Sequence, residues 1–377
     1  MIYLDNAATT YPKPESVYEK MDWVNRNMAV NAGRGSYNVA RKATQIIDET
    51  RSQINNLVHG NGNEKVILTP SATISANIIL KGLNIKQGDT IYVSPYEHNA
   101  IIRPLYSICE KTGSKMVEMP LEKDGQIDLE KLKYLFIKDA PNYICCTHVS
   151  NVTGYILPVE EIFSLGKEYS TVNILDASQS LGLVDIDVKN ANADFIIFAG
   201  HKSLYGPFGC AGFIDNSNIV LNTFLEGGTG SDSLNHEMSD SAPGRYEAAS
   251  KNIVAIAGLN EALKQLNQSE IYKHEKKLTE YAVGQLRTVD HVIVYGVEDE
   301  DKHIGVISFN IDGYMAEDIG NILDADFDIA VRTGYHCTPL IHNYLDDKQY
   351  LGTVRIGLGQ FNSEEDIDEL INALEEL

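Results

Sequence analysis

Residues 193–207 read Ala-Asp-Phe-Ile-Ile-Phe-Ala-Gly-His-Lys-Ser-Leu-Tyr-Gly-Pro, an apolar run of strand length that leads directly to a lysine. The run stops at Gly200, and Lys202 follows between His201 and Ser203. A lysine just past a buried strand is costly to desolvate, so its position indicates a chemical role. One such role is to hold an aldehyde cofactor as a Schiff base.

Short apolar runs alternate with helical patterns on both sides of this segment. The predicted strands are 65–69, 90–94, 115–119, 143–148, 172–176, 195–199 and 209–215, and the predicted helices are 75–83, 100–112, 129–136 and 160–169. This alternation predicts an α/β fold in which a mostly parallel, seven-stranded sheet is flanked by helices. Strand 209–215 follows its predecessor too closely for a crossover, so we expect it to run antiparallel.

The pattern changes after about residue 250. Long helices are predicted at 252–265 and 271–287, shorter ones at 316–324 and 364–377, and strands at 292–295, 306–311 and 354–357. This mixture predicts a smaller α+β domain. We therefore expect a large domain at 16–250 and a small domain made of 1–15 and 251–377.

The composition limits the kinds of partner that the protein is expected to bind. Of the 377 residues, 31 are basic and 53 acidic, and the net charge of −22 argues against binding to nucleic acid or to an anionic membrane. No apolar run approaches the roughly 20 residues that span a bilayer. The N-terminal residues lack the basic start and apolar core of a signal peptide. A cytoplasmic location is the resulting prediction.

The cysteines do not indicate a disulfide framework or a metal site. There are five of them, an odd number, and no Cys-x-x-Cys pair occurs. Cys145 and Cys146 are adjacent in an apolar run, and neighbouring strand residues point to opposite faces of a sheet. We therefore predict no metal.

Polar residues lie at the ends of four of the predicted strands. Thr73 stands at the start of a helix, Asp176 ends a strand, and His98 and Lys202 follow two others. Taken singly, these residues could be a helix cap, a structural histidine, a second cap and a buried lysine. Ligands bind beyond the carboxyl ends of strands in an open parallel sheet. Together the four residues offer a phosphate site, a ring neighbour, a pyridinium partner and an amine, which are the groups that pyridoxal phosphate needs.

The motifs in this order resemble those of class V, fold-type I pyridoxal-phosphate enzymes, and most closely the cysteine desulfurases and selenocysteine lyases. The resemblance covers nearly the whole chain. It rests on Tyr3-Leu-Asp-Asn-Ala-Ala-Thr-Thr10, Ala32-Gly-Arg-Gly35, Glu97-His98, His148-Val-Ser-Asn-Val-Thr-Gly154, Asp176-Ala-Ser-Gln179, Gly200-His-Lys202, Tyr205-Gly-Pro207, Arg245-Tyr-Glu247, Val331-Arg-Thr-Gly-Tyr-His-Cys337 and Arg355.

The resemblance implies a role for each motif residue. Lys202 would form the Schiff base, Asp176 would pair with the pyridinium nitrogen, and His98 would stack on the ring and shuttle protons. The other residues implied for the cofactor are Gln179 at the phenolic oxygen, Ala72, Thr73 and His201 at the phosphate, and Asn151 near the ring. Ser250 matches a residue that reaches the phosphate of the neighbouring subunit, so the resemblance also implies a homodimer with its active site at the interface.

The substrate that the resemblance implies is L-cysteine or selenocysteine. The residues implied for it are Arg355, as a bidentate carboxylate clamp, with Asn151, Arg332, Asn6 and Ala7. The sequence around Cys337 resembles the short catalytic loop of SUF-type desulfurases, in which the thiolate takes sulfur from the cofactor-bound cysteine as a persulfide. Arg332 and His336 are expected to favour the thiolate, and an acceptor protein would then receive the sulfur.

The chain departs from the family pattern at several of these positions. Tyr335 stands where the family usually has histidine, and Thr338 stands where it commonly has alanine. Ala199 and Ala72 replace residues that are often hydroxyl-bearing, so fewer hydroxyl contacts to a phosphate are expected.

Three alternatives to cysteine desulfurase stay open on sequence alone. The first is a selenocysteine lyase with the same residues. The second is another class V enzyme, such as an aminotransferase or a different lyase, in which Cys337 is only a small buried residue. The third is a scaffold protein that has lost the cofactor.

Overall fold

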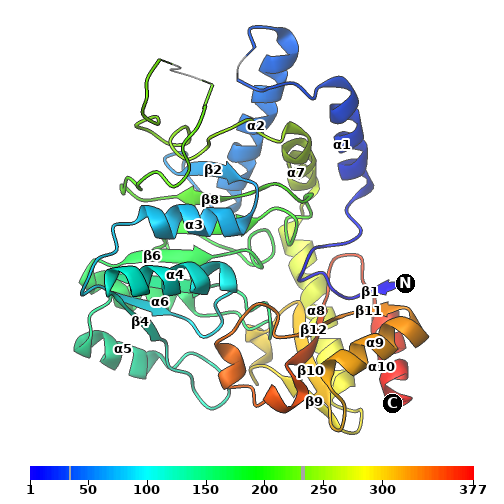
Figure 1. The fold of residues 1–377 in the computed structure, drawn as a ribbon. Helices are drawn as coiled ribbons and strands as arrows, with labels where there is room; N and C mark the ends of the chain where they lie inside the picture. Colours follow the sequence, from blue (N-terminus) through cyan, green and yellow to red (C-terminus); the bar gives the residue numbers. More distant parts are fainter. Residues whose placement is uncertain (34, 231–233) are drawn as a thin grey trace.

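The computed structural model describes residues 1–33, 35–230 and 234–377, so Arg34 of the motif at 32–35 lies outside the described residues. Figure 1 shows a large sheet with helices on both of its faces and, beside it, a smaller sheet that lies close to both chain termini. The arrangement is that of an α/β unit joined to a smaller α+β unit.

The large sheet has seven strands in the order β2-β8-β7-β6-β5-β3-β4. These strands are β2 (Lys65–Thr69), β3 (Thr90–Val93), β4 (Lys115–Glu118), β5 (Tyr143–Thr147), β6 (Val172–Asp176), β7 (Phe195–Ala199) and β8 (Ala211–Asp215). Only β8 runs antiparallel to both of its neighbours, and the other paired strands are parallel. The predicted mostly parallel sheet and its antiparallel strand are both confirmed.

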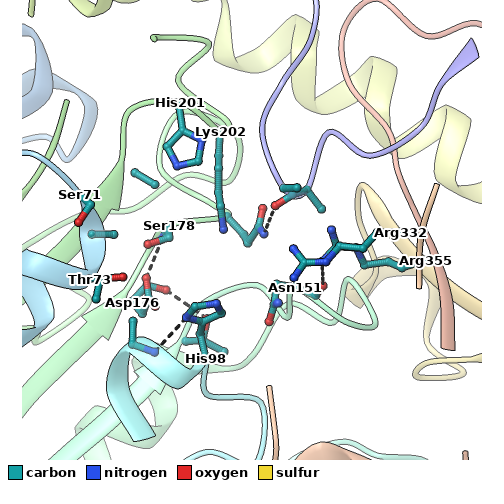
Figure 2. A pocket seen from close by; sticks show the side chains of 17 residues that line it. Ser71, Thr73, His98, Asn151, Asp176, Ser178, His201, Lys202, Arg332 and Arg355 are labelled. Atoms are coloured by element: carbon teal, nitrogen blue, oxygen red, sulfur yellow. Dashed lines mark hydrogen bonds between the residues drawn. The ribbon is translucent and has the colours of Figure 1, made fainter. Parts of the chain in front are cut away.

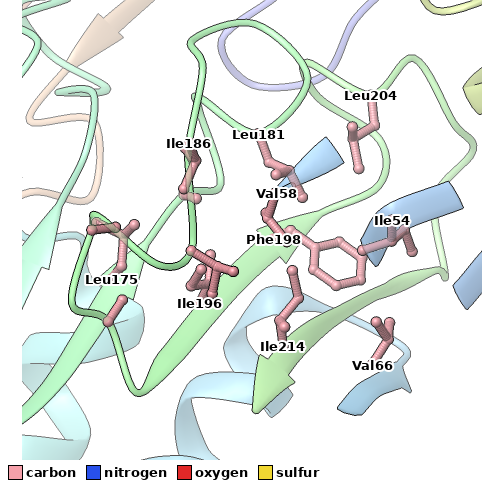
Figure 3. Packing of buried hydrophobic residues seen from close by; sticks show 14 of the residues in the cluster. Ile54, Val58, Val66, Leu175, Leu181, Ile186, Ile196, Phe198, Leu204 and Ile214 are labelled. Atoms are coloured by element: carbon pink, nitrogen blue, oxygen red, sulfur yellow. The ribbon is translucent and has the colours of Figure 1, made fainter. Parts of the chain in front are cut away.

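Strand residues alternate between two apolar clusters, one on each face of this sheet. In β7, Ile196 and Phe198 pack with one cluster, whereas Phe195 and Ile197 pack with the other. Figure 3 shows Phe198 and Ile196 among apolar side chains from several segments of the first cluster. Because successive strand residues point to opposite faces, a continuous apolar run such as β7 belongs in the middle of a covered sheet.

The same alternation places the neighbouring cysteines. Cys145 lies in the cluster beneath α3 and α4, and Cys146 lies in the cluster on the opposite face. All five cysteines are free, which agrees with the expectation that they form no disulfide framework. Among the described residues, no group of three or more metal-ligating side chains occurs.

Ten α-helices surround the two sheets in the described part of the chain. They are α1 (Glu15–Asn27), α2 (Asn38–Leu57), α3 (Ala72–Gly82), α4 (Asn99–Thr112), α5 (Leu129–Lys138), α6 (Val159–Gly166), α7 (Ile253–Gln265), α8 (Gln268–Leu286), α9 (Ala316–Phe327) and α10 (Glu364–Glu375). Helices α3 and α4 cover one face of the large sheet, while α2, α5, α6 and α7 pack with the other. None of the helices in the described ranges is both long and apolar enough to cross a membrane.

The smaller sheet has four antiparallel strands in the order β12-β13-β10-β9. They are β9 (Val292–Tyr295), β10 (Val306–Ile311), β12 (Arg332–Gly334) and β13 (Thr353–Gly357), and a separate parallel pair joins β1 (Ile2–Tyr3) to β11 (Ile329–Ala330). Apolar residues of α8, α9 and α10 pack with this sheet in one cluster. The pairing of β1 ties the N-terminal segment to the C-terminal part of the chain (Figure 1).

Two helices and three short strands were not predicted from the sequence. Helix α1 buries only Val17 and Val24, and this apolar stripe is too sparse to predict a helix. Helix α2 is likewise absent from the predicted helices. Strands β1, β11 and β12 have only two or three residues each. The domain boundary at residue 250 stays a prediction, and the buried residues of α7 pack with the core of the large sheet.

Candidate active site

Five parallel strands end at one edge of the large sheet, and the residues that follow them enclose a pocket. We call it the strand-end pocket; its volume is about 220 Å³. Its lining residues are Ala7, Ala8, Ser71, Ala72, Thr73, His98, Ala100, Thr147, Asn151, Asp176, Ser178, Gln179, Ala199, His201, Lys202, Arg332 and Arg355. The sheet therefore gathers side chains that lie more than a hundred positions apart in the sequence, as expected for the carboxyl ends of parallel strands.

Figure 2 shows how the pocket is divided. The hydroxyl groups of Ser71 and Thr73 lie at one end, and the guanidinium groups of Arg332 and Arg355 lie at the other. Lys202 points into the space between them. The pocket thus has an anion-binding character at both ends and an amine in the middle.

The amine of Lys202 has an unusual acidity. Burial is the main cause that lowers the pKa of Lys202 to about 8; the charge of Asp176 opposes this shift, and the positive charges of Arg355 and Arg332 contribute to it. Desolvation disfavours the ammonium form. A lysine with this pKa is partly neutral near pH 7, and the neutral form is the nucleophile.

Asp176 ends β6 and is buried. Its Oδ1 accepts a hydrogen bond from the backbone N–H of Ser178 at 3.0 Å, which fixes the carboxylate at the C-terminal end of β6. The aspartate also acts electrostatically on Lys202 and His98, because its charge raises the pKa of each. It is therefore a fixed negative charge on the floor of the pocket.

His98 caps the N-terminus of α4. Its Nδ1 accepts a hydrogen bond from Ala100 N at 3.0 Å, so the proton of the neutral ring is on Nε2. Burial, followed by the charge of Lys202, lowers the pKa of His98 to about 4. Figure 2 shows the His98 ring facing the pocket, and the bond to Ala100 N leaves Nε2 as the donor of the neutral ring.

The end of the pocket near α3 offers unsatisfied polar groups. Ser71 caps α3 by accepting from Ile74 N at 3.3 Å, and a helix N-terminus leaves its first N–H groups free. Within the described part of the chain, Ser178 Oγ and His201 Nδ1 are buried without a hydrogen-bond partner. Burial lowers the pKa of His201 to about 4, so its ring is neutral. Buried polar atoms without partners are costly, so these two pocket atoms are available to bind a ligand.

Two of the hydroxyl groups at this end come from residues outside the predicted site. They belong to Ser71 and Ser178, which both line the pocket. Ala72 and Ala199 also line it, as backbone neighbours without a hydroxyl group. The expected shortage of hydroxyl contacts is therefore offset by two serines. The sequence feature that points to Ser178 is its position two residues beyond Asp176, the aspartate at the end of a strand.

The opposite end of the pocket carries two arginines. Arg355 is 1% exposed; its Nη2 is paired with Asp5 Oδ1 at 2.7 Å, and its Nη1 donates to the carbonyl oxygen of Asn151 at 2.9 Å. Its Nε has no partner within the described residues. Arg332 reaches the pocket from β12. A carboxylate ligand would therefore meet two guanidinium groups, one of them already oriented by Asp5.

Cys337 lies in a turn of residues 335–338, which we call the cysteine turn. The cysteine is exposed, and Arg332 Nη2 lies 3.5 Å from its sulfur. Its backbone oxygen accepts from Asn99 N at 2.7 Å, which docks the turn on the start of α4. A second cavity leads from Cys337 and shares Thr73 and His98 with the strand-end pocket. The thiol therefore stands beside the opening of the pocket.

One part of the expected thiol environment is wrong. His336 was expected to favour the thiolate, but its Nε2 is hydrogen-bonded to Thr353 Oγ1 at 2.8 Å and the ring is buried. Burial, together with the charges of Arg355 and Arg332, holds the pKa of His336 well below its usual range. A neutral ring carries no positive charge. Of Arg332 and His336, only Arg332 therefore brings a positive charge near the thiol.

The remaining predicted site residues are divided between the pocket and other places. Gln179 and Ala7 line the pocket and are joined by a hydrogen bond from Gln179 Nε2 to Ala7 O at 2.8 Å. Asn6 does not line it, because its amide is bonded to Gly357 O and to the side chain of Asn362.

Ser250 is exposed and accepts from Asn31 Nδ2 at 3.2 Å, outside the pocket of its own chain. Its predicted role at a neighbouring subunit stays a prediction. Asn151 lies in the pocket and also donates from Nδ2 to the carbonyl oxygen of His336 at 2.8 Å. It thereby joins the pocket to the cysteine turn.

Comparison with known proteins gives consistent results. The aminotransferase class-V family matches residues 2–370. A probable cysteine desulfurase from Halalkalibacterium halodurans is 32% identical over 386 residues, which span 100% of this chain and 92% of the relative. A cysteine desulfurase from Escherichia coli strain K12 is 31% identical over 391 residues, which span 100% of this chain and 93% of the relative.

Solved structures agree with the sequence relatives. The apo structure of a cysteine desulfurase from Thermococcus onnurineus superposes with a TM-score of 0.90 at 30% identity and covers 100% of this chain and 94% of the other. A cysteine desulfurase from Escherichia coli in an S-sulfonic acid form has a TM-score of 0.85 at 26% identity, with coverage of 100% and 94%. The similarity extends over both the large and the small sheet.

Proposed function

Because this chain belongs to the aminotransferase class-V family, we propose that it is a pyridoxal-phosphate-dependent cysteine desulfurase. It converts L-cysteine to L-alanine and takes up the sulfur as a persulfide on Cys337. The observation that carries the proposal is the meeting of two reactive groups. The amine of Lys202 points into the strand-end pocket, and the exposed thiol of Cys337 opens into a cavity that shares Thr73 and His98 with it.

The residues present fit pyridoxal phosphate. Ser178 Oγ and His201 Nδ1 are buried without partners at the end where α3 begins, and they suit the phosphate. Asp176 suits the pyridinium nitrogen, since it presents a fixed carboxylate on the pocket floor. Lys202 supplies the amine. The bound cofactor would supply an aldehyde for a covalent link and a ring that accepts electrons from the substrate carbon.

The chain's own residues would handle the proton of the substrate. Lys202, with a pKa of about 8, is basic enough to accept the Cα proton of L-cysteine and acidic enough to return one. The neutral His98 can donate from Nε2 toward the product carbon, because its Nδ1 is occupied by Ala100 N. Asp176 keeps a negative charge below both groups.

The arginines would orient the substrate. Arg355 and Arg332 lie at the end of the pocket away from Ser71, so they can hold the carboxylate of an amino acid whose amine faces Lys202. This orientation leaves the side chain of cysteine free to extend toward the cysteine turn. Positioning of this kind converts a bimolecular encounter into an intramolecular step.

The sulfur transfer is a displacement at the substrate sulfur. The Cys337 thiolate attacks Sγ of the substrate, a sulfur–sulfur bond forms, and the bond between Cβ and Sγ breaks. The electron pair of that bond remains with the carbon part, which takes up protons and leaves as L-alanine. Cys337 becomes a persulfide, and an acceptor thiol then removes the outer sulfur. Arg332 Nη2, 3.5 Å from Cys337 Sγ, can orient this sulfur for the attack.

Product analysis tests this proposal. The wild-type holoenzyme should convert L-cysteine to L-alanine and, in the presence of a reducing thiol, release one sulfide for each alanine. Cys337→Ser should retain the cofactor and lose about 10²–10⁴-fold in sulfide release, because it lacks the group that acts directly on sulfur. Sulfide release by Cys337→Ser at the wild-type rate would overturn the role of this residue.

Other inferences from the sequence stay predictions. They are a preference between cysteine and selenocysteine, a homodimer in which Ser250 reaches the neighbouring active site, a sulfur-acceptor protein and a cytoplasmic location. Turnover of L-selenocysteine measured beside that of L-cysteine would decide the first.

A further inference from the structure

A buried pair of side chains holds the cysteine turn from outside the strand-end pocket. The side chains of His342 and Asp347 are 3% and 0% exposed. His342 Nδ1 is hydrogen-bonded to Asp347 Oδ2, and His342 Nε2 donates to the carbonyl oxygen of Tyr335 at 3.0 Å. A carbonyl oxygen only accepts, so Nε2 carries the proton of that bond, and the Asp347 carboxyl group holds the ring through Nδ1.

The carbonyl oxygen of Tyr335 accepts the hydrogen bond that closes the cysteine turn. The donor of this bond is Thr338 N at 3.0 Å, so the chain reverses around His336 and Cys337. These two residues have φ values of 47° and 59°. A left-handed backbone is unfavourable for residues that carry a Cβ, and it persists only where the surroundings hold it. The donor of His342 is one of the contacts that hold it.

Stability alone does not explain this pair. Two buried polar side chains must both be desolvated, and well-packed apolar residues of the same volume often stabilise a protein equally well. What apolar residues cannot supply is a donor with a fixed direction at Tyr335 O. The pair therefore contributes geometry, and the geometry it determines is that of Cys337, two residues further along the chain.

We propose that His342 and Asp347 are positioning residues that fix the Cys337 thiol for attack on the substrate sulfur. This inference rests on the proposed function. The pair touches neither the pocket nor the thiol, so it acts only through the cysteine turn. A displacement of about 1 Å in a reacting group can cost about 10²-fold in rate.

Two reactions of the same holoenzyme separate this role from general damage. Desulfuration of L-cysteine needs both Lys202 and Cys337. Exchange of the Cα proton of L-alanine for deuterium in D₂O needs Lys202 and the cofactor but not Cys337. For His342→Leu we expect kcat of desulfuration to fall about 10- to 100-fold, while KM for cysteine, the rate of alanine exchange and the visible absorbance of the cofactor stay unchanged.

Three further variants sharpen the test. His342→Gln keeps an amide donor within reach of Tyr335 O, and it should recover most of the lost kcat. Asp347→Asn keeps the shape and replaces the carboxyl group by an amide, and its kcat should lie between those of His342→Leu and His342→Gln. His59→Leu is the matched control, because it removes a histidine–aspartate hydrogen bond of 2.8 Å to Asp185 at an exposed site; its kcat should equal that of the wild type.

The possible outcomes decide between a positioning role and a structural one. Equal losses of desulfuration and alanine exchange in His342→Leu and Asp347→Asn would overturn the proposal, as would an unchanged kcat in both. If His342→Leu does not fold, Asp347→Asn gives the same comparison. A wild-type enzyme that exchanges alanine but forms no sulfide from cysteine would instead overturn the proposed function, so the two failures are distinguishable.

Discussion

The strand-end pocket and the cysteine turn each present one reactive side chain, and they do so by different physical means. Lys202 follows β7, whose five residues are all buried, so its position depends on apolar packing of the large sheet. Cys337 is exposed, and its position depends on hydrogen bonds to backbone oxygens, from His342 to Tyr335, from Asn151 to His336 and from Asn99 to Cys337 itself.

The difference explains how each group is tuned. Burial is needed to lower the pKa of Lys202, and only a covered sheet provides it. A thiol that must pass sulfur to an acceptor has to stay open to solvent, so it cannot be fixed by apolar packing. Directional hydrogen bonds place it instead. Variants of the pocket should therefore affect every reaction of the cofactor, whereas variants of the turn should affect sulfur transfer alone.

Lys202→Ala should produce the largest effect and should abolish both kinds of reaction. It removes the amine that links the cofactor and the base that moves the Cα proton, so desulfuration and alanine exchange should each fall by at least about 10⁴-fold. The visible absorbance of the lysine-bound cofactor should disappear. Absorbance spectra and the two assays measure this directly.

Cys337→Ser is the comparison variant for this prediction. It should lose desulfuration while keeping alanine exchange and the cofactor absorbance. If Cys337→Ser also lost exchange, the pocket and the turn would not be separable, and the contrast between the two regions would fail. An unchanged absorbance in Lys202→Ala would show that another amine holds the cofactor.

The second prediction concerns the pH dependence of aldehyde capture by the cofactor-free protein. Because burial lowers the pKa of Lys202 from 10.5 to about 8, the neutral amine should increase about tenfold between pH 7 and pH 9 and then level off. The rate at which added pyridoxal phosphate gains the absorbance of the linked form should follow this curve.

A lysine-containing peptide is the control for the pH experiment. Its unperturbed amine should become about a hundredfold more reactive between pH 7 and pH 9, and it should not level off in this range. A protein rate that followed the peptide would show that Lys202 is solvated, and the proposed tuning by burial would be wrong.

The two regions also differ in how well the sequence predicts them. The strands of the large sheet were predicted within a few residues, because each is a short apolar run that ends in a polar group. Asp176 ends such a run, Lys202, His98 and Thr73 follow others, and all four lie in the pocket. Parallel strands bring their carboxyl ends together, so placing the strands also places these side chains.

The support of the cysteine turn could not be predicted in the same way. His342 lies in a short 3₁₀ segment and Asp347 directly precedes another, and neither segment has a periodic pattern. The carbonyl oxygen that His342 binds leaves no trace in the sequence. His336 stands beside the thiol in sequence, yet its ring is turned to Thr353. Neighbours along the chain in a tight turn point in different directions, so adjacency misplaced this residue.

The smallest expected effect tests the contact between the two regions. Thr338 is fully buried, and its Oγ1 donates to Asn151 Oδ1 at 2.6 Å, so it joins the cysteine turn to a residue of the pocket. Thr338→Val keeps the volume and leaves the Asn151 oxygen without this donor, which should lower the free energy of unfolding by about 1–3 kcal/mol. Asn151 keeps its bond to His336 O at 2.8 Å, so the turn should loosen without detaching.

Desulfuration by Thr338→Val should therefore fall only a few-fold, less than in His342→Leu, with alanine exchange unchanged. Thr153→Val is the matched control: Thr153 is 1% exposed, two residues from Asn151, and its Oγ1 has no hydrogen-bond partner in the described structure. Losing an unpaired buried hydroxyl should leave both stability and rate as they are, or raise stability slightly. If Thr338→Val slowed alanine exchange as much as desulfuration, the cysteine turn would also support the pocket. The two regions would then not act independently.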